Sequence, residues 1–342
     1  MTPVRVLADH TWSGGRWWTA DEILAGAPAP ESADPPHLPR SGRRVAAEMS
    51  ARRIAGTAVP GLRDHHVHLG LIDRVALATS VLSSVDDLGW IESEVLQWRR
   101  TGIGRCVVRA AGPFLTAPGG YPTGRSWAPA EAVLAIGSAE DAAATVRRLA
   151  AQGVDMVKVI LHTGMPLLDE ESLLAVVGSA HPLGLPVVVH AEGPGQAVRA
   201  AAAGADALAH APWTETLDDE ALRAMVGNIA WISTLAIHPR GDDAQRVALD
   251  NLARFAAAGG VVRYGTDMGN GPTPADLNGP ELEALVEAGL ELPAIMNAIC
   301  RADRDHDHLT WTPYDPPGSA GDLPRWFATL RRRPVADLPG SR

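Results

Sequence analysis

Lysine is almost absent from this sequence: 29 of its 30 basic side chains are arginine, and the exception is Lys158. Arginine stays protonated in proteins, whereas a buried lysine can lose its proton and become a neutral, nucleophilic amine. Lys158 lies in an apolar run, residues 154–161, which is typical of a buried strand. A lysine there must be paired, chemically modified or bound to something, unless its stem carries the ammonium to the end of the strand.

Cysteine is scarce as well, since the 342 residues include only Cys106 and Cys300. Two cysteines make no disulfide framework, and their spacing does not fit a zinc motif, so a reducing compartment is expected. No run approaches the roughly 20 apolar residues that a membrane span needs. The first residues also lack the apolar stretch of a signal peptide. These absences predict a cytoplasmic protein.

Negative charge exceeds positive charge, and the formal net charge is −10. This balance disfavours nucleic acid and anionic membranes as the main partners. A hydrophobic content of 46% is ample for one large core or for two ordinary ones. We therefore expect a small-molecule substrate as the partner, and the composition is compatible with a homo-oligomer.

From residue 57 onward, short apolar runs alternate with alanine-rich helical patterns. Several of these patterns stop at a glycine, as at Gly184, Gly204 and Gly227, where a helix C-terminus favours glycine. The alternation predicts an α/β fold with buried parallel strands, specifically a (β/α)8 TIM barrel over residues 58–300. The expected strands are 58–69, 79–85, 106–110, 154–161, 186–190, 207–210, 229–234 and 261–264.

The flanks of the predicted barrel are irregular. Residues 1–57 and 301–342 are expected to form the N-terminal and C-terminal parts of a small accessory β-domain, because the ends of a barrel lie near each other. The second flank is expected to finish in a solvated tail. A doubly wound parallel sheet is the alternative fold, but no Gly-x-Gly-x-x-Gly turn follows the first strand.

Polar side chains stand at the carboxyl ends of the predicted strands, which is where active sites form in barrels. Strand alternation places His66 and His68 on one face, so both imidazoles can bind a single metal ion. Lone histidines at strand ends are usually structural, but here similar groups come from five strands. Neutral imidazoles with a carboxylate and a lysine indicate a divalent metal site of the zinc kind. The other members of this set are Lys158, His190, His210 and Asp267.

These motifs resemble the amidohydrolase superfamily, particularly the branch with imidazolonepropionases and metal-dependent Xaa-Pro dipeptidases. The similarity covers roughly residues 57–300, with the motifs in the family's order. The matching segments are residues 59–68, 84–89, 157–159, 185–193, 205–210 and 264–267. The C-terminal end departs from the family pattern, since a short tail follows the barrel.

The resemblance implies a site with two divalent metal ions, most simply Zn²⁺. His66 and His68 would bind the more buried ion with Asp267, and His190 and His210 would bind the second ion. Lys158 would be N6-carboxylated by CO₂ and would bridge the two ions. A metal-bridging hydroxide would attack the substrate, with Asp267 as the proton shuttle and His210 as a second catalytic residue. A site with one ion, in which Lys158 is not a ligand, is the alternative within the family.

Four further residues are candidates for substrate contacts. Tyr121 and Arg125 lie in a loop rich in glycine and proline, and loops after barrel strands form substrate walls. Arg125 could hold a substrate carboxylate, although a solvated arginine is the commoner outcome. His162 and Trp213 follow apolar runs and are expected near the pocket. His65 is expected to point away from the metals.

The resemblance predicts a metal-dependent amidohydrolase that hydrolyses an amide or cyclic amide of a small molecule. A deaminase or lactonase on the same binuclear site is the alternative. A lyase, an isomerase or a non-catalytic metal-binding barrel is a remoter one, because one fold hosts varied functions.

Overall fold

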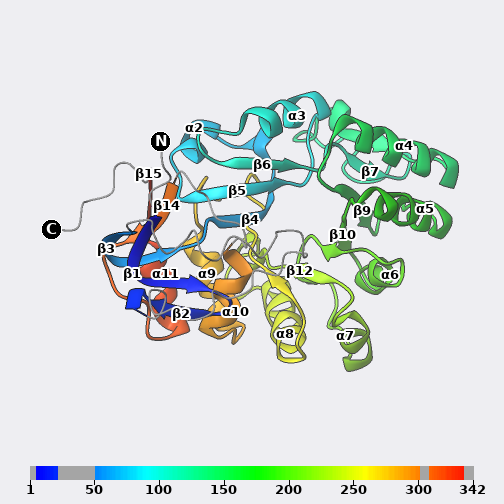
Figure 1. Ribbon diagram of the computed structural model, residues 1–342. Helices are drawn as coiled ribbons and strands as arrows, with labels where there is room; N and C mark the ends of the chain where they lie inside the picture. Colours follow the sequence, from blue (N-terminus) through cyan, green and yellow to red (C-terminus); the bar gives the residue numbers. More distant parts are fainter. Residues whose placement is uncertain (1–4, 22–50, 301–307, 335–342) are drawn as a thin grey trace. The chain divides into compact units, whose positions relative to one another are not determined.

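The computed structural model describes residues 5–21, 51–300 and 308–334 (Figure 1). The chain divides into two compact units, one of residues 1–62 with 292–342 and the other of residues 63–291. Large parts of both predicted flanks lie outside the described residues, so the accessory β-domain and its boundaries stay predictions. Among the described residues, no helix is both long and apolar enough to cross a membrane.

The first unit contains a five-stranded sheet in the order β15–β14–β3–β1–β2. β1 and β2 form an antiparallel hairpin, while β3 pairs with β1 in parallel. The described residues of this unit also include the helices α10 (Leu292–Ile299) and α11 (Leu323–Phe327). The strands are β1 (Arg5–Ser13), β2 (Arg16–Thr19), β3 (Ala51–Val59), β14 (His308–Thr312) and β15 (Arg331–Pro334).

The second unit has a three-stranded sheet, β4–β5–β6, and a seven-stranded sheet in the order β13–β12–β11–β10–β9–β7–β8. Every pairing in the seven-stranded sheet is parallel. This observation agrees with the predicted α/β class. The strands are β4 (Leu62–Val67), β5 (Leu82–Asp87), β6 (Val107–Ala110), β7 (Phe114–Thr116), β8 (Val133–Ala135), β9 (Val157–His162), β10 (Val187–Glu192), β11 (Ala207–Leu208), β12 (Ala230–Ile232) and β13 (Val262–Arg263).

Helices alternate with these strands, as the alanine-rich patterns predict (Figure 1). Many begin at an acidic or hydroxyl side chain that accepts a backbone N–H; Ser138 and Asp169 do so for α4 and α5. α4 ends at Gly153, which has a φ of 88° and so adopts the left-handed conformation that favours glycine. The helices are α2 (Arg74–Ala78), α3 (Glu92–Thr101), α4 (Ala139–Gln152), α5 (Glu170–Ala180), α6 (Gln196–Ala202), α7 (Asp219–Met225), α8 (Asp243–Ala257) and α9 (Gly279–Glu287).

The predicted strand 58–69 is wrong as a single element. β3 ends at Val59 in the sheet of the first unit, and β4 begins at Leu62. Pro60 lies between them, and proline has no N–H with which to continue a sheet ladder. The strand predicted at 79–85 is also displaced, because α2 is capped at Thr79 and β5 runs from Leu82 to Asp87. Neither β7 nor β8 is among the predicted strands.

A core cluster of the second unit draws small and branched apolar side chains from or beside β5, β6, β9, β10, β11 and β12. Each member is at least 94% buried, so these strands share one interior. The cluster consists of Leu88, Ala111, Met156, Val188, Ala207, Ala209, Ala230 and Ile232.

Glu281 of α9 is fully buried, and its Oε2 accepts a hydrogen bond from the backbone N–H of Ala236 at 2.7 Å. Burial raises the pKa of this carboxyl to about 7 from an ordinary 4.5, although hydrogen bonds from Ser233 and Ala236 oppose the rise. The folded protein therefore holds a proton that the unfolded chain releases. Its free energy of unfolding should fall as the pH rises from about 4.5 through about 7.

Glu281→Gln should remove this pH dependence, because glutamine keeps the accepting oxygen and cannot ionise. We expect the variant to be more stable than the wild type by about 1–3 kcal/mol at pH 8, and by less at pH 5. Denaturant titrations of both proteins at the two pH values measure the difference. An equal change at pH 5 and pH 8 would show that Glu281 does not titrate in this range.

Candidate metal centre

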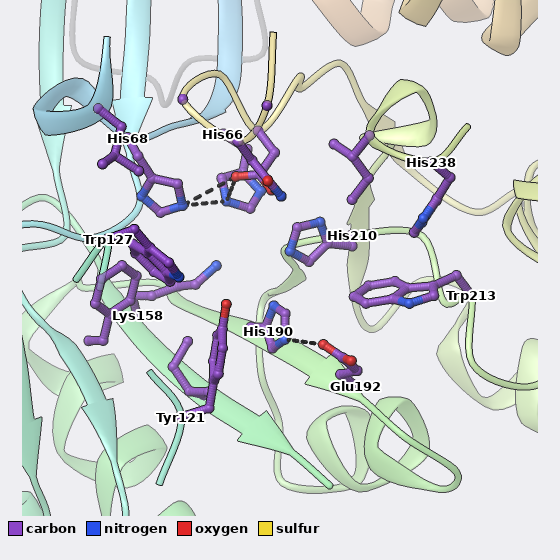
Figure 2. Close-up of a pocket in the computed structure, with 18 residues that line it drawn as sticks. His66, His68, Tyr121, Trp127, Lys158, His190, Glu192, His210, Trp213 and His238 are labelled. Carbon is purple, nitrogen blue, oxygen red and sulfur yellow. Dashed lines mark hydrogen bonds and ion pairs between the residues drawn. The ribbon is translucent and has the colours of Figure 1, made fainter. Parts of the chain in front are cut away.

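A cavity of about 450 Å³ opens where the predicted strand-end residues gather (Figure 2). All six predicted metal ligands line it, together with two of the four candidate substrate residues, Tyr121 and Trp213. The six come from β4, β9 and β10 and from the segments after β4, β11 and β13. They are His66, His68, Lys158, His190, His210 and Asp267, and each is at least 91% buried.

Three acceptor atoms converge at one end of this group. His66 Nε2 and His68 Nε2 lie 3.3 Å apart, and each is 3.2 Å from Asp267 Oδ1. The other ring nitrogen of each histidine faces a backbone carbonyl, His66 Nδ1 to Ala209 O at 2.8 Å and His68 Nδ1 to Gly89 O at 3.0 Å. A carbonyl only accepts, so each Nδ1 donates, and each Nε2 faces Asp267 with a lone pair whenever its ring is neutral. Two lone pairs and a carboxylate oxygen at these distances repel one another unless a cation lies among them.

The charge states in this trio support the same arrangement. Burial lowers the pKa of His66 well below its ordinary value, so its ring is neutral at physiological pH. Burial alone would raise the pKa of Asp267, but its interactions with the imidazoles of His66 and His68 outweigh that effect and hold the pKa well below the usual range. Neutral imidazoles with an ionised carboxylate form a donor set suited to a divalent cation.

Lys158 lies in β9 and is only 1% exposed. Its Nζ has no hydrogen-bond partner among the described residues, which is costly for a buried amine. Burial lowers the pKa of Lys158 to about 7, although Asp267 and Asp87 oppose the change. A substantial fraction of the amine is therefore neutral near pH 7, as reaction with CO₂ requires. Figure 2 shows the side chain extending toward the rings of His66, His190 and His210.

His190 and His210 form the other end of the group. Their rings lie 5.0 Å apart and nearly perpendicular, and burial lowers the pKa of both imidazoles. His210 Nδ1 contacts Thr234 Oγ1 at 2.9 Å, and His190 Nε2 contacts Glu192 Oε2 at 3.1 Å. Each contact occupies one ring nitrogen and leaves the other available as a ligand, in the way that outer hydrogen bonds orient metal-binding histidines.

Asp64 ties the first strand of the site to the last. It is fully buried, and its carboxylate accepts from the backbone N–H of His66 at 2.9 Å and from that of Thr266 at 3.1 Å. The Thr266 hydroxyl also donates to Asp64 Oδ2 at 2.5 Å. Asp64 thus fixes the backbone that carries His66 against the backbone that carries Asp267, rather than orienting an imidazole ring.

The candidate substrate residues are only partly brought together. Tyr121 stacks on His162 with ring centroids 4.5 Å apart, and Trp213 packs edge-on against His210 at 5.1 Å. His162 lies behind Tyr121, and its Nδ1 contacts Glu192 Oε2 at 2.8 Å. Arg125 is exposed, with its Cζ 5.5 Å from the centre of the Tyr121 ring. Neither His162 nor Arg125 is among the described residues that line the cavity.

Some cavity residues could not be assigned from the sequence, chiefly Phe114, Ile237 and Asn270. Phe114 belongs to β7, a strand that the apolar pattern did not reveal. Asn270 has a weak signal, since a short polar residue three places after Asp267 is typical of a turn. His65 points away as predicted, and its Nδ1 lies 3.0 Å from Asp86 Oδ2.

No protein-family model matches the sequence, and a comparison with curated proteins finds no match. Solved structures do match over nearly the whole chain. An Xaa-Pro dipeptidase with bound methionine has a TM-score of 0.69 at 16% identity, over 98% of this chain and 99% of that chain. The ochratoxinase of A. niger has a TM-score of 0.69 at 16% identity, over 95% of this chain and 92% of that chain. A putative prolidase from Bifidobacterium longum has a TM-score of 0.67 at 21% identity, over 86% of this chain and 85% of that chain.

The chain has an amidohydrolase fold. This likeness agrees with the resemblance drawn from the strand-end motifs, and at such identities it concerns the fold alone. The activity has to be argued from the residues that line the cavity.

In this amidohydrolase fold, Asn270 holds the carboxylate of Asp267. Asn270 Nδ2 donates to Asp267 Oδ2 at 2.9 Å, and the backbone N–H of Asn270 donates to Asp267 O at 2.9 Å. Asp267 has a φ of 52°, a left-handed conformation that is uncommon outside glycine, so these bonds stabilise a costly backbone. The amide leaves Asp267 Oδ1 directed at the two histidines.

Asn270→Ala should therefore lower kcat about tenfold while metal content stays near that of the wild type. Metal analysis beside steady-state kinetics measures both quantities. Asn228→Ala, which removes an exposed amide that bonds Ala224 O, is the matched control and should leave kcat unchanged. An unaltered kcat in Asn270→Ala would show that Asn270 does not position the carboxylate of Asp267 for catalysis.

Proposed function

We propose that this chain is a metal-dependent hydrolase of the amidohydrolase superfamily, which cleaves a C–N bond in an amide or cyclic amide of a small molecule. The observation that carries the proposal is the convergence of His66 Nε2, His68 Nε2 and Asp267 Oδ1 within 3.3 Å of one another. Only a cation makes that arrangement favourable for neutral rings. The unpartnered amine of Lys158 in the same cavity is the second support.

We further propose that the strands of the second unit close into a (β/α)8 barrel. At one junction the backbone N–H of His65 donates to Tyr264 O at 3.0 Å, joining β4 to the segment after β13. At the other the N–H of Asp155 donates to Ala110 O at 2.8 Å, joining β6 to the segment before β9. A closed ring would bring all the strand ends to one mouth, where barrel enzymes place their active sites.

In the proposed site, His66, His68 and Asp267 would hold one divalent ion, and His190 and His210 would hold another. Imidazole and carboxylate ligands suit zinc. Lys158, carboxylated on Nζ, would supply oxygen ligands to these ions. When bound, divalent ions would polarise the substrate carbonyl and lower the pKa of water.

The side chains of the protein position and move the proton. Asp267 accepts the proton of the attacking water and returns it to the leaving nitrogen, which is the work of a general base and then a general acid. Asn270 keeps its second oxygen in place. His210 packs against Trp213 and faces the same cavity, so it lies beside the reacting carbonyl.

Metal analysis combined with a substrate panel tests this function. The purified protein should contain close to two divalent ions per chain, and it should hydrolyse members of a panel of anilides and hydantoins. Turnover of aminopurines alone, or of lactones alone, would instead favour the deaminase or the lactonase alternative. A metal-loaded protein that turns over no member would favour a non-catalytic metal-binding role. We place this activity in the cytoplasm, on a small-molecule substrate.

A further inference from the structure

Beyond the six candidate ligands, the cavity wall carries little charge. Glu192 is the one acidic side chain there among the described residues, and it is 31% exposed; His238 is the one further histidine of that wall within the same residues. Lys158 is the only basic residue besides histidine that lines the cavity within the same residues. The predicted carboxylate anchor, Arg125, has its Cζ 5.5 Å from the centre of the Tyr121 ring and does not line the cavity. A substrate carboxylate would therefore meet an anion in this wall rather than a cation.

Two histidines hold Glu192 in place through one carboxylate oxygen, and its other oxygen can still accept a hydrogen bond. Its Oε2 takes both contacts, from His162 Nδ1 at 2.8 Å and from His190 Nε2 at 3.1 Å. No hydrogen bond in the part of the chain that the structure describes uses Oε1. Strand alternation puts Glu192 on the same face of β10 as His190, two residues before it, so the carboxylate lies beside the candidate metal centre.

Aromatic rings flank His190, the imidazole that Glu192 contacts. His190, which Glu192 contacts, has its ring 5.7 Å from Tyr121 on one side and 5.8 Å from Trp213 on the other (Figure 2). Trp127 continues the wall at 6.0 Å from Tyr121, and Phe114 follows at 5.9 Å from Trp127. Aromatic faces bind flat apolar groups and also attract cations within about 6 Å of the ring centre. The cavity of about 450 Å³ has the volume of a small-ligand site.

We propose that the substrate of this hydrolase carries an aromatic or similarly flat group and a cationic nitrogen that binds Glu192 between Tyr121 and Trp213, and that it carries no free carboxylate. The inference rests on the proposed function for the amide itself. A charge-assisted hydrogen bond to Glu192 Oε1 and the nearby ring faces would supply the selectivity.

Three matched anilides test the proposal. β-Alanyl-4-nitroanilide carries an ammonium, butyryl-4-nitroanilide is neutral, and succinyl-4-nitroanilide carries a carboxylate. Calorimetric titration of metal-loaded Asp267→Asn protein measures binding without turnover. We expect the ammonium compound to bind about tenfold tighter than the carboxylate compound, with the neutral one between them. Increasing ionic strength should weaken binding of the ammonium compound and leave the affinity of the neutral compound unchanged.

Variants assign the preference to Glu192. Adding Glu192→Gln should bring the three affinities within about threefold of one another, whereas adding Glu220→Gln, at an exposed carboxylate of α7, should not alter them. Metal content is measured in each variant. Adding Arg125→Ala should leave all three affinities unchanged. The proposal would be overturned if the carboxylate compound bound most tightly, if Arg125→Ala weakened binding of that compound, or if none of the three compounds bound.

The same compounds separate this inference from the proposed function. If they bind in the expected order but the wild type hydrolyses no amide, hydantoin, lactone or aminopurine, then the hydrolase proposal fails and the charge preference stands. If the wild type hydrolyses the carboxylate compound with the highest kcat/KM, then the hydrolase proposal stands and the charge preference is overturned.

Discussion

Replacing Lys158 with arginine is expected to lower the metal content by at least one ion per chain and to reduce kcat/KM about a thousandfold or more. The substitution keeps a long, flexible stem and the positive charge of an ordinary lysine. A guanidinium cannot lose its proton at accessible pH, so it cannot react with CO₂ and places a fixed charge beside the ions. Metal analysis and kinetics on the purified variant measure both losses.

Two companion variants show whether the amine itself is the cause. Lys158→Ala supplied with a short-chain carboxylic acid should regain part of its metal and activity, because the added carboxylate can take the place of the carbamate. In metal-free protein, Lys158→Met should raise the free energy of unfolding by about 1–3 kcal/mol, since it removes a buried amine that has no partner. Full metal content and activity in Lys158→Arg would exclude a carbamate ligand.

Asp267→Asn is expected to keep most of its metal while kcat falls by about 10²- to 10⁴-fold. The amide retains an oxygen that can face His66 Nε2 and His68 Nε2, which lie 3.2 Å from Asp267 Oδ1 in the wild type. It cannot accept the proton of the attacking water at a useful pH. Metal analysis and single-turnover kinetics on one panel substrate would measure the two effects separately.

His66→Ala provides the contrast, because it removes a ligand that carries no proton in the proposed reaction. It should lose metal and activity together. If Asp267→Asn and His66→Ala lost equal shares of metal and of activity, then Asp267 would be a ligand only, and the assignment of the proton shuttle would be wrong.

The sequence was most informative where chemistry and strand ends coincide. His66, His68, His190, His210 and Asp267 interrupt apolar runs, and the carboxyl ends of parallel strands meet in space whatever the connecting helices do. Their convergence could therefore be predicted without folding the loops. Lys158 was found by composition, since one lysine in a background of arginine indicates a position that needs an amine.

The remaining features depend on contacts that a pattern does not carry. Pro60 separates two strands that read as one apolar run, and only the pairing of β3 with β1 assigns each half to its own unit. Phe114 reaches the cavity from the short strand β7 and Asn270 from the segment after β13, and the course of both depends on tertiary packing. Arg125 shares a loop with Tyr121, yet only the tyrosine lines the cavity, because side-chain direction in a loop follows no period.

Anomalous X-ray diffraction from crystals of metal-loaded protein, measured on both sides of the zinc absorption edge, tests the central claim most directly. The account predicts two anomalous peaks, one among His66, His68 and Asp267 and one beside His190 and His210, with Lys158 Nζ extended by a planar carboxylate that reaches both. A single peak would contradict the bridging role of Lys158. The absence of any peak, with Lys158 as an unmodified ammonium, would contradict the metal centre itself.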